Sequence, residues 1–369
     1  MKYIDLCGNK VSRLGMGCMR LPVKDDKIDF EVAMSMADLA IDGGINYFDT
    51  AYVYHNGESE IFVKEVIRKH GRDNLFIADK LPIYNCEVAA DLDKFLDEQL
   101  ERLGTDYIDY YLFHCLNKKN YSIMNKLNYK DFIKRNVGKD KKIRHIGFSF
   151  HDELELFKEI IDDYNWEFVQ IQFNYLDTDY QAGIDGYNYA TNKGIPVLIM
   201  EPIRGGRLAN VPKSVRKIFD KKFSNFSDAS IALKYVANFE NNKVILSGMR
   251  NVSDIESNIL LFDDELIDSF NEEELKLFVD AKKEFDNYGL INCTGCDYCK
   301  EGCPSNIPIS EIFTKYNKNV EGSESNHDWY NDLEHKVDRC VQCGLCEASC
   351  SQKLNIIESL EKVDRYFEN

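Results

Sequence analysis

The sequence predicts an α/β protein built on a (β/α)8 barrel of the TIM type, followed by a small cysteine-rich domain. Two observations carry this prediction. Short β-rich runs alternate eight times with amphipathic stretches between residues 14 and 263, and eight strand–helix units over about 250 residues are what such a barrel requires. Eight of the 12 cysteines then lie at or beyond residue 293, which indicates a change of domain.

The eight predicted strands are short, and all but the first are rich in β-branched and aromatic residues. They are LGMGC (14–18), INYFDT (45–50), LFIADK (75–80), IDYYLFH (108–114), IRHIGFS (143–149), FVQIQF (168–173), IPVLIM (195–200) and KVILSG (243–248). No glycine-rich dinucleotide fingerprint follows an early strand, which weighs against a doubly wound sheet. The segment IDLCGNKVS before the first strand is expected to form a hairpin that plugs the bottom of the barrel.

Amphipathic helices are expected between the strands. In the stretch 87–103, four leucines fall on one face and Gly104 is placed to end the helix. Further helices are expected to begin near Phe30, Glu58, Asp152, Gln181, Asp228 and Ser253. A charged helix over 265–288 leads to the tail, so we predict one domain at residues 1–286 and a second at 287–369.

Composition and charge narrow the class of function. The 369 residues are 44% hydrophobic and 30% charged, as in an ordinary globular protein, and the net charge of −17 argues against nucleic acid as a partner. No apolar run approaches the ~18 residues that span a bilayer, and the N-terminal MKYIDLCGNKVSRLG lacks the apolar core of a signal peptide. We expect a cytoplasmic protein with a small-molecule substrate and no membrane partner. The oligomeric state stays open.

Four side chains that can transfer protons or carry charge are expected at the mouth of the barrel, where the strands end. Asp49 ends the second strand, Lys80 the third and His114 the fourth, and Tyr54 lies in the loop after Asp49. Each residue alone has a plain structural interpretation, as a helix cap, a surface charge, a core histidine or one of 21 tyrosines. Their convergence on one rim favours a catalytic set.

These residues and their surroundings resemble the aldo/keto reductase family. The resemblance is carried by FDTAYVYHNGESE (48–60), ADKLP (78–82), LFHCL (112–116), GFSFH (147–151), FVQIQFNYL (168–176) and IPVLIMEPIRGGRL (195–208). It implies a catalytic tetrad of Asp49, Tyr54, Lys80 and His114. It also implies reduction of an aldehyde or ketone to an alcohol by NADPH or NADH.

Elementary electrostatics agrees with these roles. Hydride transfer to a carbonyl leaves an alkoxide that needs a proton, and an ordinary tyrosine, with a pKa near ~10, is a weak acid. An ammonium about 4 Å away stabilises the phenolate by roughly 3 pKa units at an effective dielectric near ~20. Lys80 is expected to do this, held charged by Asp49. His114 is expected to hydrogen-bond the carbonyl oxygen and so to orient it.

A basic segment is expected to take part in nucleotide binding. Residues 203–222 hold seven Lys or Arg against one acid, Asp220. The segment is either an electropositive loop after strand seven, where barrels often bind phosphate, or the face of a solvated helix. The resemblance implies that the nicotinamide carboxamide contacts Ser149 and Gln170, and that the pyrophosphate lies along Gly205, Gly206, Arg207 and Leu208.

The last strand departs from the pattern of NADPH-preferring members, which often carry a Lys and a later Arg around the adenosine phosphate. Gly248 and Asp254 stand at those places, whereas Asn258 is kept as an adenine contact. Arg250 could supply the missing charge from another position. The choice between NADPH and NADH is therefore open.

The tail contains a cysteine repeat that resembles a bacterial two-cluster ferredoxin. Cys293-x2-Cys296-x2-Cys299-x3-Cys303 recurs as Cys340-x2-Cys343-x2-Cys346-x3-Cys350, although Ser351 replaces the proline that usually follows. The resemblance implies a small ferredoxin-like α+β iron–sulfur domain with two [4Fe–4S] clusters, in which the fourth cysteine of each run binds the other cluster. One cluster would use Cys293, Cys296, Cys299 and Cys350, and the other Cys340, Cys343, Cys346 and Cys303. Two structural zinc sites are the weaker alternative.

The role of the clusters is left open by the sequence. Aldo/keto reductases with such a tail form a branch of the family, and the chain resembles it from end to end. Nicotinamide accepts hydride rather than single electrons, and no flavin motif is visible, so we favour a structural or docking role. Two alternatives are an oxidoreductase fed through the clusters by a ferredoxin-like partner and a non-catalytic redox sensor that binds nucleotide. The identity of the small carbonyl substrate is not predicted.

Overall fold

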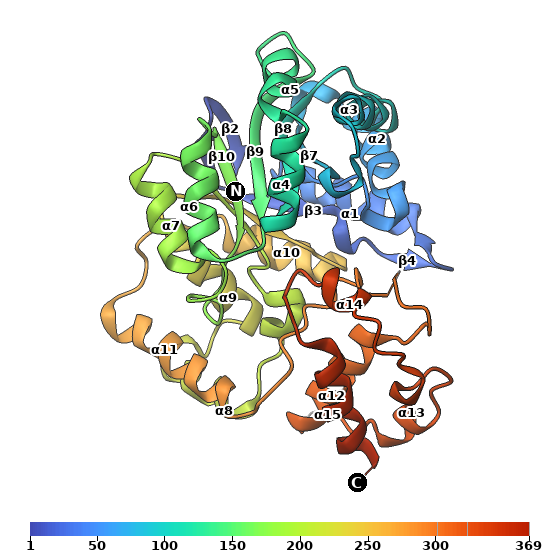
Figure 1. Cartoon of the computed structure of the whole chain (residues 1–369). Helices are drawn as coiled ribbons and strands as arrows, with labels where there is room; N and C mark the ends of the chain where they lie inside the picture. The colour runs from blue at the N-terminus through green and yellow to red at the C-terminus, as the bar shows by residue number, and fades with distance from the viewer. Residues whose placement is uncertain (301, 323, 369) are drawn as a thin grey trace. The chain divides into compact units, whose positions relative to one another are not determined.

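The structure is a computed structural model in which residues 1–300, 302–322 and 324–368 are described. The chain forms two compact units (Figure 1). The first contains Met1–Pro202 and Leu233–Ser269, and the second contains Ile203–Ala232 and Phe270–Asn369. The domain boundary predicted at residue 286 stays a prediction.

The first unit holds a closed barrel of eight parallel strands in the order β10-β11-β12-β3-β6-β7-β8-β9. The strands are β3 (Leu14–Gly17), β6 (Tyr47–Asp49), β7 (Phe76–Leu81), β8 (Ile108–Leu116), β9 (Ile143–Phe150), β10 (Phe168–Gln172), β11 (Val197–Met200) and β12 (Asn242–Ser247). Each lies on one of the eight predicted runs. The predicted (β/α)8 barrel is confirmed.

An antiparallel hairpin of β1 (Tyr3–Leu6) and β2 (Asn9–Ser12) closes the end of the barrel at which the strands begin. Leu6 and Val11 are fully buried in one apolar cluster with Tyr47, the first residue of β6. The hydroxyl of Tyr110, near the start of β8, donates to the Leu6 carbonyl at 2.9 Å. The predicted plug is therefore present.

Helices surround the barrel strands (Figure 1). In α3 (Ala89–Leu103) the four predicted leucines are buried, and Gly104 ends the helix in the left-handed conformation with φ 62°. The other helices of this unit are α1 (Phe30–Asp42), α2 (Glu58–His70), α4 (Lys118–Lys126), α5 (Tyr129–Asn136), α6 (Leu154–Asp163), α7 (Gly183–Asn192) and α10 (Val252–Leu261). Short elements are β4 (Val23–Lys24), β5 (Lys27–Ile28), η1 (Cys18–Arg20), η2 (Tyr54–Gly57), η3 (Arg72–Asn74) and η4 (Ile83–Asn85).

The second unit is helical. Its elements are η5 (Arg204–Ala209), α8 (Lys213–Phe223), α11 (Glu272–Asp286), α12 (Ile309–Val320), α13 (His327–Asn331), η6 (Val337–Arg339), α14 (Leu345–Ala348) and α15 (Ile356–Glu368), while α9 (Asp228–Ala237) runs from this unit into the first. Phe219 of α8 packs on Phe278 of α11 with ring centroids 5.3 Å apart. No strand occurs among the described residues beyond β12, so the tail is more helical than the expected α+β arrangement. Two amphipathic helices, α12 and α15, supply more than half of the buried residues in its core.

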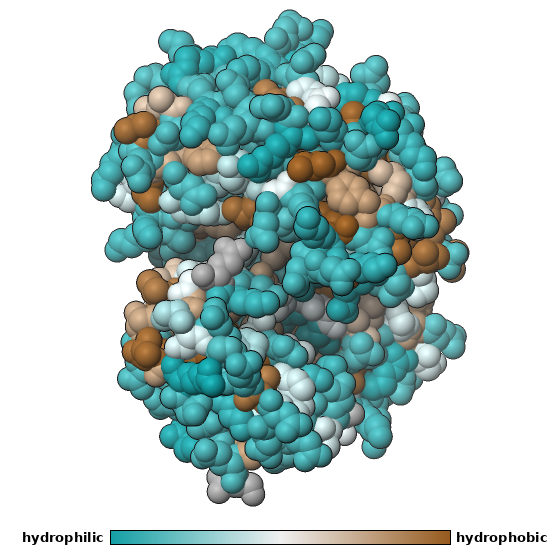
Figure 2. Space-filling model, turned by 90° about the vertical axis from the view of Figure 1, so that its right-hand side faces the viewer, coloured by the Kyte–Doolittle hydropathy of each residue, from teal (hydrophilic) through white to brown (hydrophobic). Residues whose placement is uncertain are grey.

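Hydrophilic residues predominate on the face drawn in Figure 2, and hydrophobic residues lie there singly or in small groups. This is the usual pattern where side chains contact water. Within the described part of the chain, no helix has the length and apolar character needed to cross a membrane.

Candidate active site and cysteine centres

Asp49, Lys80 and His114 come from three neighbouring barrel strands, β6, β7 and β8. Each lies at or near the C-terminal end of its strand, and each residue is at most 3% exposed. Tyr54 begins η2, the short helix that follows β6. Because parallel strands end at the same rim, the structure brings all four predicted residues to the mouth of the barrel.

The ammonium of Lys80 is surrounded by three acceptors. Its Nζ lies 2.5 Å from Asp49 Oδ1, 2.7 Å from the Thr50 carbonyl oxygen and 3.3 Å from the hydroxyl oxygen of Tyr54. An ammonium has three protons to donate, and a buried charge is stable only when it is paired and hydrogen-bonded. The contact with Thr50 is absent from the sequence prediction because a backbone carbonyl leaves no residue-type signal.

Tyr54 keeps its proton in this environment. Burial raises the pKa of Tyr54 well above its usual value, and the negative charge of Asp49 adds to the rise. The Tyr54 pKa is therefore not lowered overall, although a lowering by the Lys80 ammonium was expected. The first physical reason is the burial of the phenol, and the second is the Asp49 carboxylate, which lies 2.5 Å from the Lys80 ammonium and opposes its field at Tyr54.

His114 is held in its neutral form. Burial lowers its pKa well below the usual value, and the positive charges of Lys80 and His151 add to this. Its ring lies edge-on to Tyr54 with centroids 6.0 Å apart, and the hydroxyl of Tyr84 is 3.3 Å from its Nδ1. Tyr84 was not predicted. The only available signal was its place in η4, directly after β7, where loops line the mouth of a barrel.

A second polar cluster lies beside Lys80 on the outer side of β7. Asp79 and Glu60 are fully buried, and burial followed by the negative charge of Glu60 raises the pKa of Asp79 well above its usual value. Glu60 pairs with Arg102 at 2.8 Å, and the Gln99 amide donates to the Lys80 carbonyl at 3.1 Å. The strand segment that carries Lys80 is thus fixed by side chains that the hydrophobic pattern could not identify.

Ser149 and Gln170, the two residues predicted to contact nicotinamide, are neighbours. They are paired in register between β9 and β10 and are at most 2% exposed. The Ser149 hydroxyl accepts the Cys115 N–H at 2.9 Å. The side-chain oxygen of Gln170 is buried and has no hydrogen-bond partner among the described residues. Since buried polar atoms are nearly always paired, this oxygen fits a ligand donor such as a carboxamide NH2.

The residues predicted around the adenosine end lie after β12. The Asn258 amide donates to the Ser247 hydroxyl at 3.1 Å. Arg250 is exposed, and its backbone N–H donates to the Asp254 carboxylate at 3.1 Å. A Cβ at Gly248 would come within 3.2 Å of the Arg20 side chain.

The basic segment divides into a loop and a helix, both in the second unit. Five of its seven cations lie on α8, where Arg216 bonds to Asp220 at 2.7 Å and to Asp228 at 2.8 Å. For this part, the solvated-helix interpretation is the better one. Only Arg204 and Arg207 lie in η5, together with Gly205, Gly206 and Leu208.

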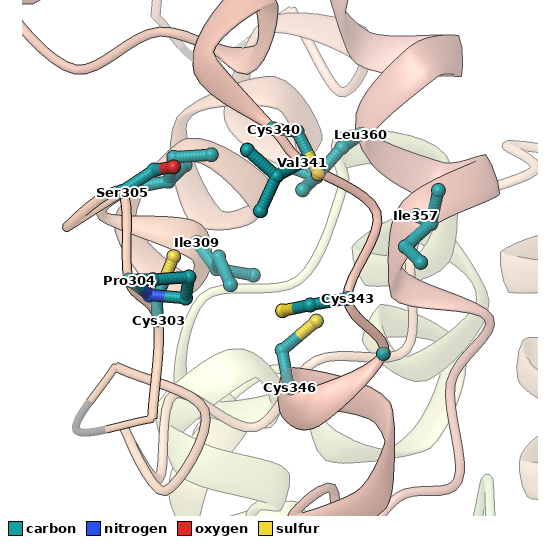
Figure 3. Close-up of a pocket in the computed structure, with 12 residues that line it drawn as sticks. Cys303, Pro304, Ser305, Ile309, Cys340, Val341, Cys343, Cys346, Ile357 and Leu360 are labelled. Atoms are coloured by element: carbon teal, nitrogen blue, oxygen red, sulfur yellow. The ribbon is translucent and has the colours of Figure 1, made fainter.

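Four cysteines from both runs line one pocket of the tail, as Figure 3 shows. Cys340, Cys343 and Cys346 come from the second run, and Cys303 from the first. Apolar side chains, among them Ile309 and Leu360, complete the lining. Four sulfurs around an apolar pocket fit a thiolate-bound cluster. These are the four cysteines expected for the second cluster, in which the fourth cysteine of the first run joins three cysteines of the second run.

The other set is also close in space. Burial raises the pKa of Cys293 to about 12, and the nearby Cys296 and Cys350 add negative charge. Cys350 affects the pKa of Cys299 in the same direction. These thiols lose their protons readily only when a cation binds the sulfurs, which fits iron. The hydroxyl of Ser351 lies 3.7 Å from the Cys296 sulfur.

Comparison with known proteins fits this architecture. Residues 13–274 match the sequence profile of the Aldo/keto reductase family. The chain belongs to the aldo/keto reductase family. Residues 289–354 of this aldo/keto reductase match the 4Fe-4S dicluster domain.

Individual relatives are distant. An aldo-keto reductase of Fusarium vanettenii is 26% identical over 293 residues, which cover 68% of this chain and 75% of the relative. The Uncharacterized oxidoreductase YqkF of Bacillus subtilis is 34% identical over 113 residues, which cover 28% of this chain. The match spans only 35% of the length of that oxidoreductase.

Solved structures are similar to the barrel. The holo form of aldo-keto reductase AKR11C1 from Bacillus halodurans has a TM-score of 0.61 at 22% identity and covers 76% of this chain and 96% of its own. An aldo-keto reductase from Klebsiella pneumoniae in complex with NADPH has a TM-score of 0.59 at 19% identity. The match covers 76% of this chain and 94% of the Klebsiella chain. At these identities the likeness shows the fold.

Proposed function

We propose that this aldo/keto reductase reduces a small aldehyde or ketone to the alcohol, using NADPH or NADH. The observation that supports the proposal most directly is the distance of 3.3 Å between Lys80 Nζ and the hydroxyl of Tyr54, at the mouth of the barrel. A phenol beside a buried ammonium is suited to give a proton to an oxygen on which negative charge develops.

His114 binds and orients the carbonyl group. The Tyr84 hydroxyl lies 3.3 Å from Nδ1 of its neutral ring, and we assign the hydroxyl as the donor and Nδ1 as the acceptor. The proton of the ring then resides on Nε2 and donates to the substrate oxygen. In this arrangement Tyr84 selects the tautomer that catalysis needs.

The nicotinamide, when bound, supplies the hydride that forms the new C–H bond at the carbonyl carbon. The electron pair of the C=O π bond moves to oxygen, and Tyr54 transfers its hydroxyl proton to that oxygen. Lys80 stabilises the phenolate that remains, and the phenolate regains a proton from solvent. Because Tyr54 stays fully protonated before reaction, the acid form is present over the whole neutral pH range.

Nucleotide binding is supported by two observations. The unpartnered, buried side-chain oxygen of Gln170 lies next to Ser149, where a carboxamide could bind. The similar Klebsiella pneumoniae enzyme was solved in complex with NADPH. We propose that the carboxamide binds Ser149 and Gln170, that the pyrophosphate lies along Gly205–Leu208, and that Gly248, Arg250 and Asn258 lie near the adenosine.

The eight tail cysteines would hold two [4Fe–4S] clusters, which we propose to be structural or to dock a redox partner. The tail core is small, and Cys293, Cys303, Cys340 and Cys350 pack directly against it. A metal bound at a site that the unfolded chain lacks adds its binding free energy to the free energy of folding. Cluster binding therefore contributes to folding of the tail.

The direct test uses anaerobically purified full-length protein. NADPH and NADH oxidation is followed with a panel of small aldehydes and ketones, and the alcohol products are identified. We expect carbonyl-dependent oxidation with one alcohol formed per nucleotide. Carbonyl reduction that requires a viologen-reduced or ferredoxin-like donor and proceeds without nicotinamide would overturn the proposal in favour of electron transfer through the clusters.

A further inference from the structure

The loop η5 (Arg204–Ala209) has an unusual backbone. Arg204, Gly205 and Gly206 have φ angles of 47°, 65° and 95°, so three successive residues lie on the left-handed side. Glycine adopts such angles freely, but a residue with a Cβ is strained there. Strained residues of this kind persist only where the surrounding structure fixes them. The loop therefore depends on its neighbours for its shape.

One neighbour is the segment that begins the first cysteine run. A Cβ at Gly205 would overlap the carbonyl group of Thr294 and come within 3.0 Å of its Cα. The two backbones thus lie directly against each other. Thr294 is 4% exposed and follows Cys293, a predicted ligand of the first cluster. The position of Gly205 is set by the residue next to a cluster ligand.

The other neighbour is the end of α12. Arg207 Nε lies 3.9 Å from Glu321 Oε1, and the two side chains are only 12% and 11% exposed. A second nitrogen of Arg207 donates to the Asn292 side chain at 3.5 Å, and the guanidinium lies 5.5 Å from the Phe285 ring centroid. Burial raises the pKa of Glu321, and the positive charge of Arg207 opposes the rise. Each charge of this pair is costly without the other.

We propose that Thr294 and Glu321 are positioning residues for the nucleotide loop, so that nucleotide binding and the stability of the first cluster are linked. The inference rests on the proposed role of Gly205–Leu208 in nucleotide binding. A cluster that holds Cys293 fixes Thr294, Thr294 fixes Gly205, and Glu321 fixes Arg207. By reciprocity, nucleotide bound to the loop stabilises the segment that carries the cluster ligand.

The first test compares two carboxylates. Glu321→Gln removes the charge that holds Arg207. Glu324→Gln is the matched control, because Glu324 is an exposed carboxylate that lies 2.7 Å from the Lys318 ammonium and 3.7 Å from that of Lys315. The dissociation constant of NADPH is measured by titration of each anaerobic, iron-replete full-length protein. We expect about tenfold weaker binding for Glu321→Gln, within the usual range of coupling between sites, and no change for Glu324→Gln.

The conservative variant separates positioning from charge alone. Glu321→Asp keeps the charge on a shorter side chain and should restore part of the lost affinity. An NADPH dissociation constant equal to that of wild type in Glu321→Gln would overturn the proposal. Tighter binding would also overturn it, because Glu321 would then compete with the pyrophosphate for Arg207.

The second test measures the reciprocal effect. Iron release from the anaerobic protein to a chelator is followed with and without NADPH. We expect NADPH to slow part of the release several-fold in wild type, and to do so much less in Glu321→Gln. Gly205→Ala should both weaken NADPH binding and speed iron release, because its methyl group displaces Thr294. If NADPH does not change the rate of iron release from the wild-type protein, the proposed linkage is wrong.

These outcomes are distinct from a failure of the proposed function. A wild-type protein that binds neither NADPH nor NADH would reject the reductase proposal itself. A wild-type protein that binds nucleotide and reduces carbonyls, with Glu321→Gln behaving identically, would reject only the positioning role.

Discussion

The ammonium nitrogen of Lys80 lies 2.5 Å from the Asp49 carboxylate, and both side chains are almost completely buried. The two charges compensate each other in a place where neither is stable alone. The pair therefore sets both the stability of the barrel mouth and the electrostatic field at the phenol of Tyr54.

Replacing Asp49 should destabilise the protein through the charge left behind. Asp49→Asn leaves a buried ammonium without its anion, which costs about 3–5 kcal/mol, and the thermal midpoint should fall clearly. The double variant Asp49→Asn with Lys80→Met removes both charges and should be more stable than Asp49→Asn alone. Thermal unfolding of the three anaerobic proteins checks this, and a double variant less stable than Asp49→Asn would contradict it.

Tyr54→Phe should remove the proton donor and leave the nucleotide site intact. We expect kcat for carbonyl reduction to fall at least ~100-fold, the lower range for general acid catalysis, with the NADPH dissociation constant nearly unchanged. Tyr52→Phe is the matched control, because the Tyr52 hydroxyl bonds to Glu98 at 2.9 Å, away from the tetrad. Equal kcat values for the two variants would remove Tyr54 from the mechanism.

The buried His114 should make stability depend on pH. Burial lowers its pKa well below the usual value, so the unfolded chain, with a histidine pKa near ~6.5, binds a proton that the folded protein does not. Stability from this site is complete above pH ~6.5 and is lost as the pH falls below that value. His114→Gln should lose this contribution, and the thermal midpoint should fall less steeply between about pH 6.5 and 5 than in wild type.

The control for this prediction is wild type, measured over the same pH range. Any acid sensitivity of the clusters affects both proteins alike, so only the difference between slopes is used. Parallel slopes for His114→Gln and wild type would show that His114 titrates normally in the folded protein.

The crossed arrangement of cysteines predicts which pairs of variants act together. Cys303 and Cys343 line the same pocket, so Cys303→Ser combined with Cys343→Ser should lose no more iron than either change alone. Cys303→Ser combined with Cys296→Ser should lose both clusters. Iron and sulfide analysis after anaerobic purification measures this, with Cys86→Ser in the barrel as the control. If Cys303→Ser with Cys343→Ser lost both clusters, and Cys303→Ser with Cys296→Ser lost only one, each run would bind its own cluster.

Sequence patterns predicted those features that depend on local order along the chain. The strands follow β-branched runs, and three tetrad residues follow from the rule that barrel strands end at one rim. The pairing of Arg207 with Glu321 could not be predicted, because the two residues are distant in sequence and neither belongs to a motif. The sign of the Tyr54 pKa shift was missed because burial and the neutralising effect of Asp49 both depend on three-dimensional packing. The tail is helical because the long segment between the cysteine runs forms α12, α13 and η6 and the segment after them forms α15.

The hydroxyl of Ser351, 3.7 Å from the Cys296 sulfur, has a consequence for the reduction potential. If Cys296 binds iron as we propose, its sulfur would carry no proton and the serine would be the donor, and a hydrogen bond to a ligand sulfur favours the more negative, reduced cluster. The matching position after Cys303 is Pro304, which has no side-chain donor. Serine in place of proline would thus make the two proposed clusters chemically unequal. Electrons that enter the tail would meet one centre whose potential is raised by a single hydroxyl group.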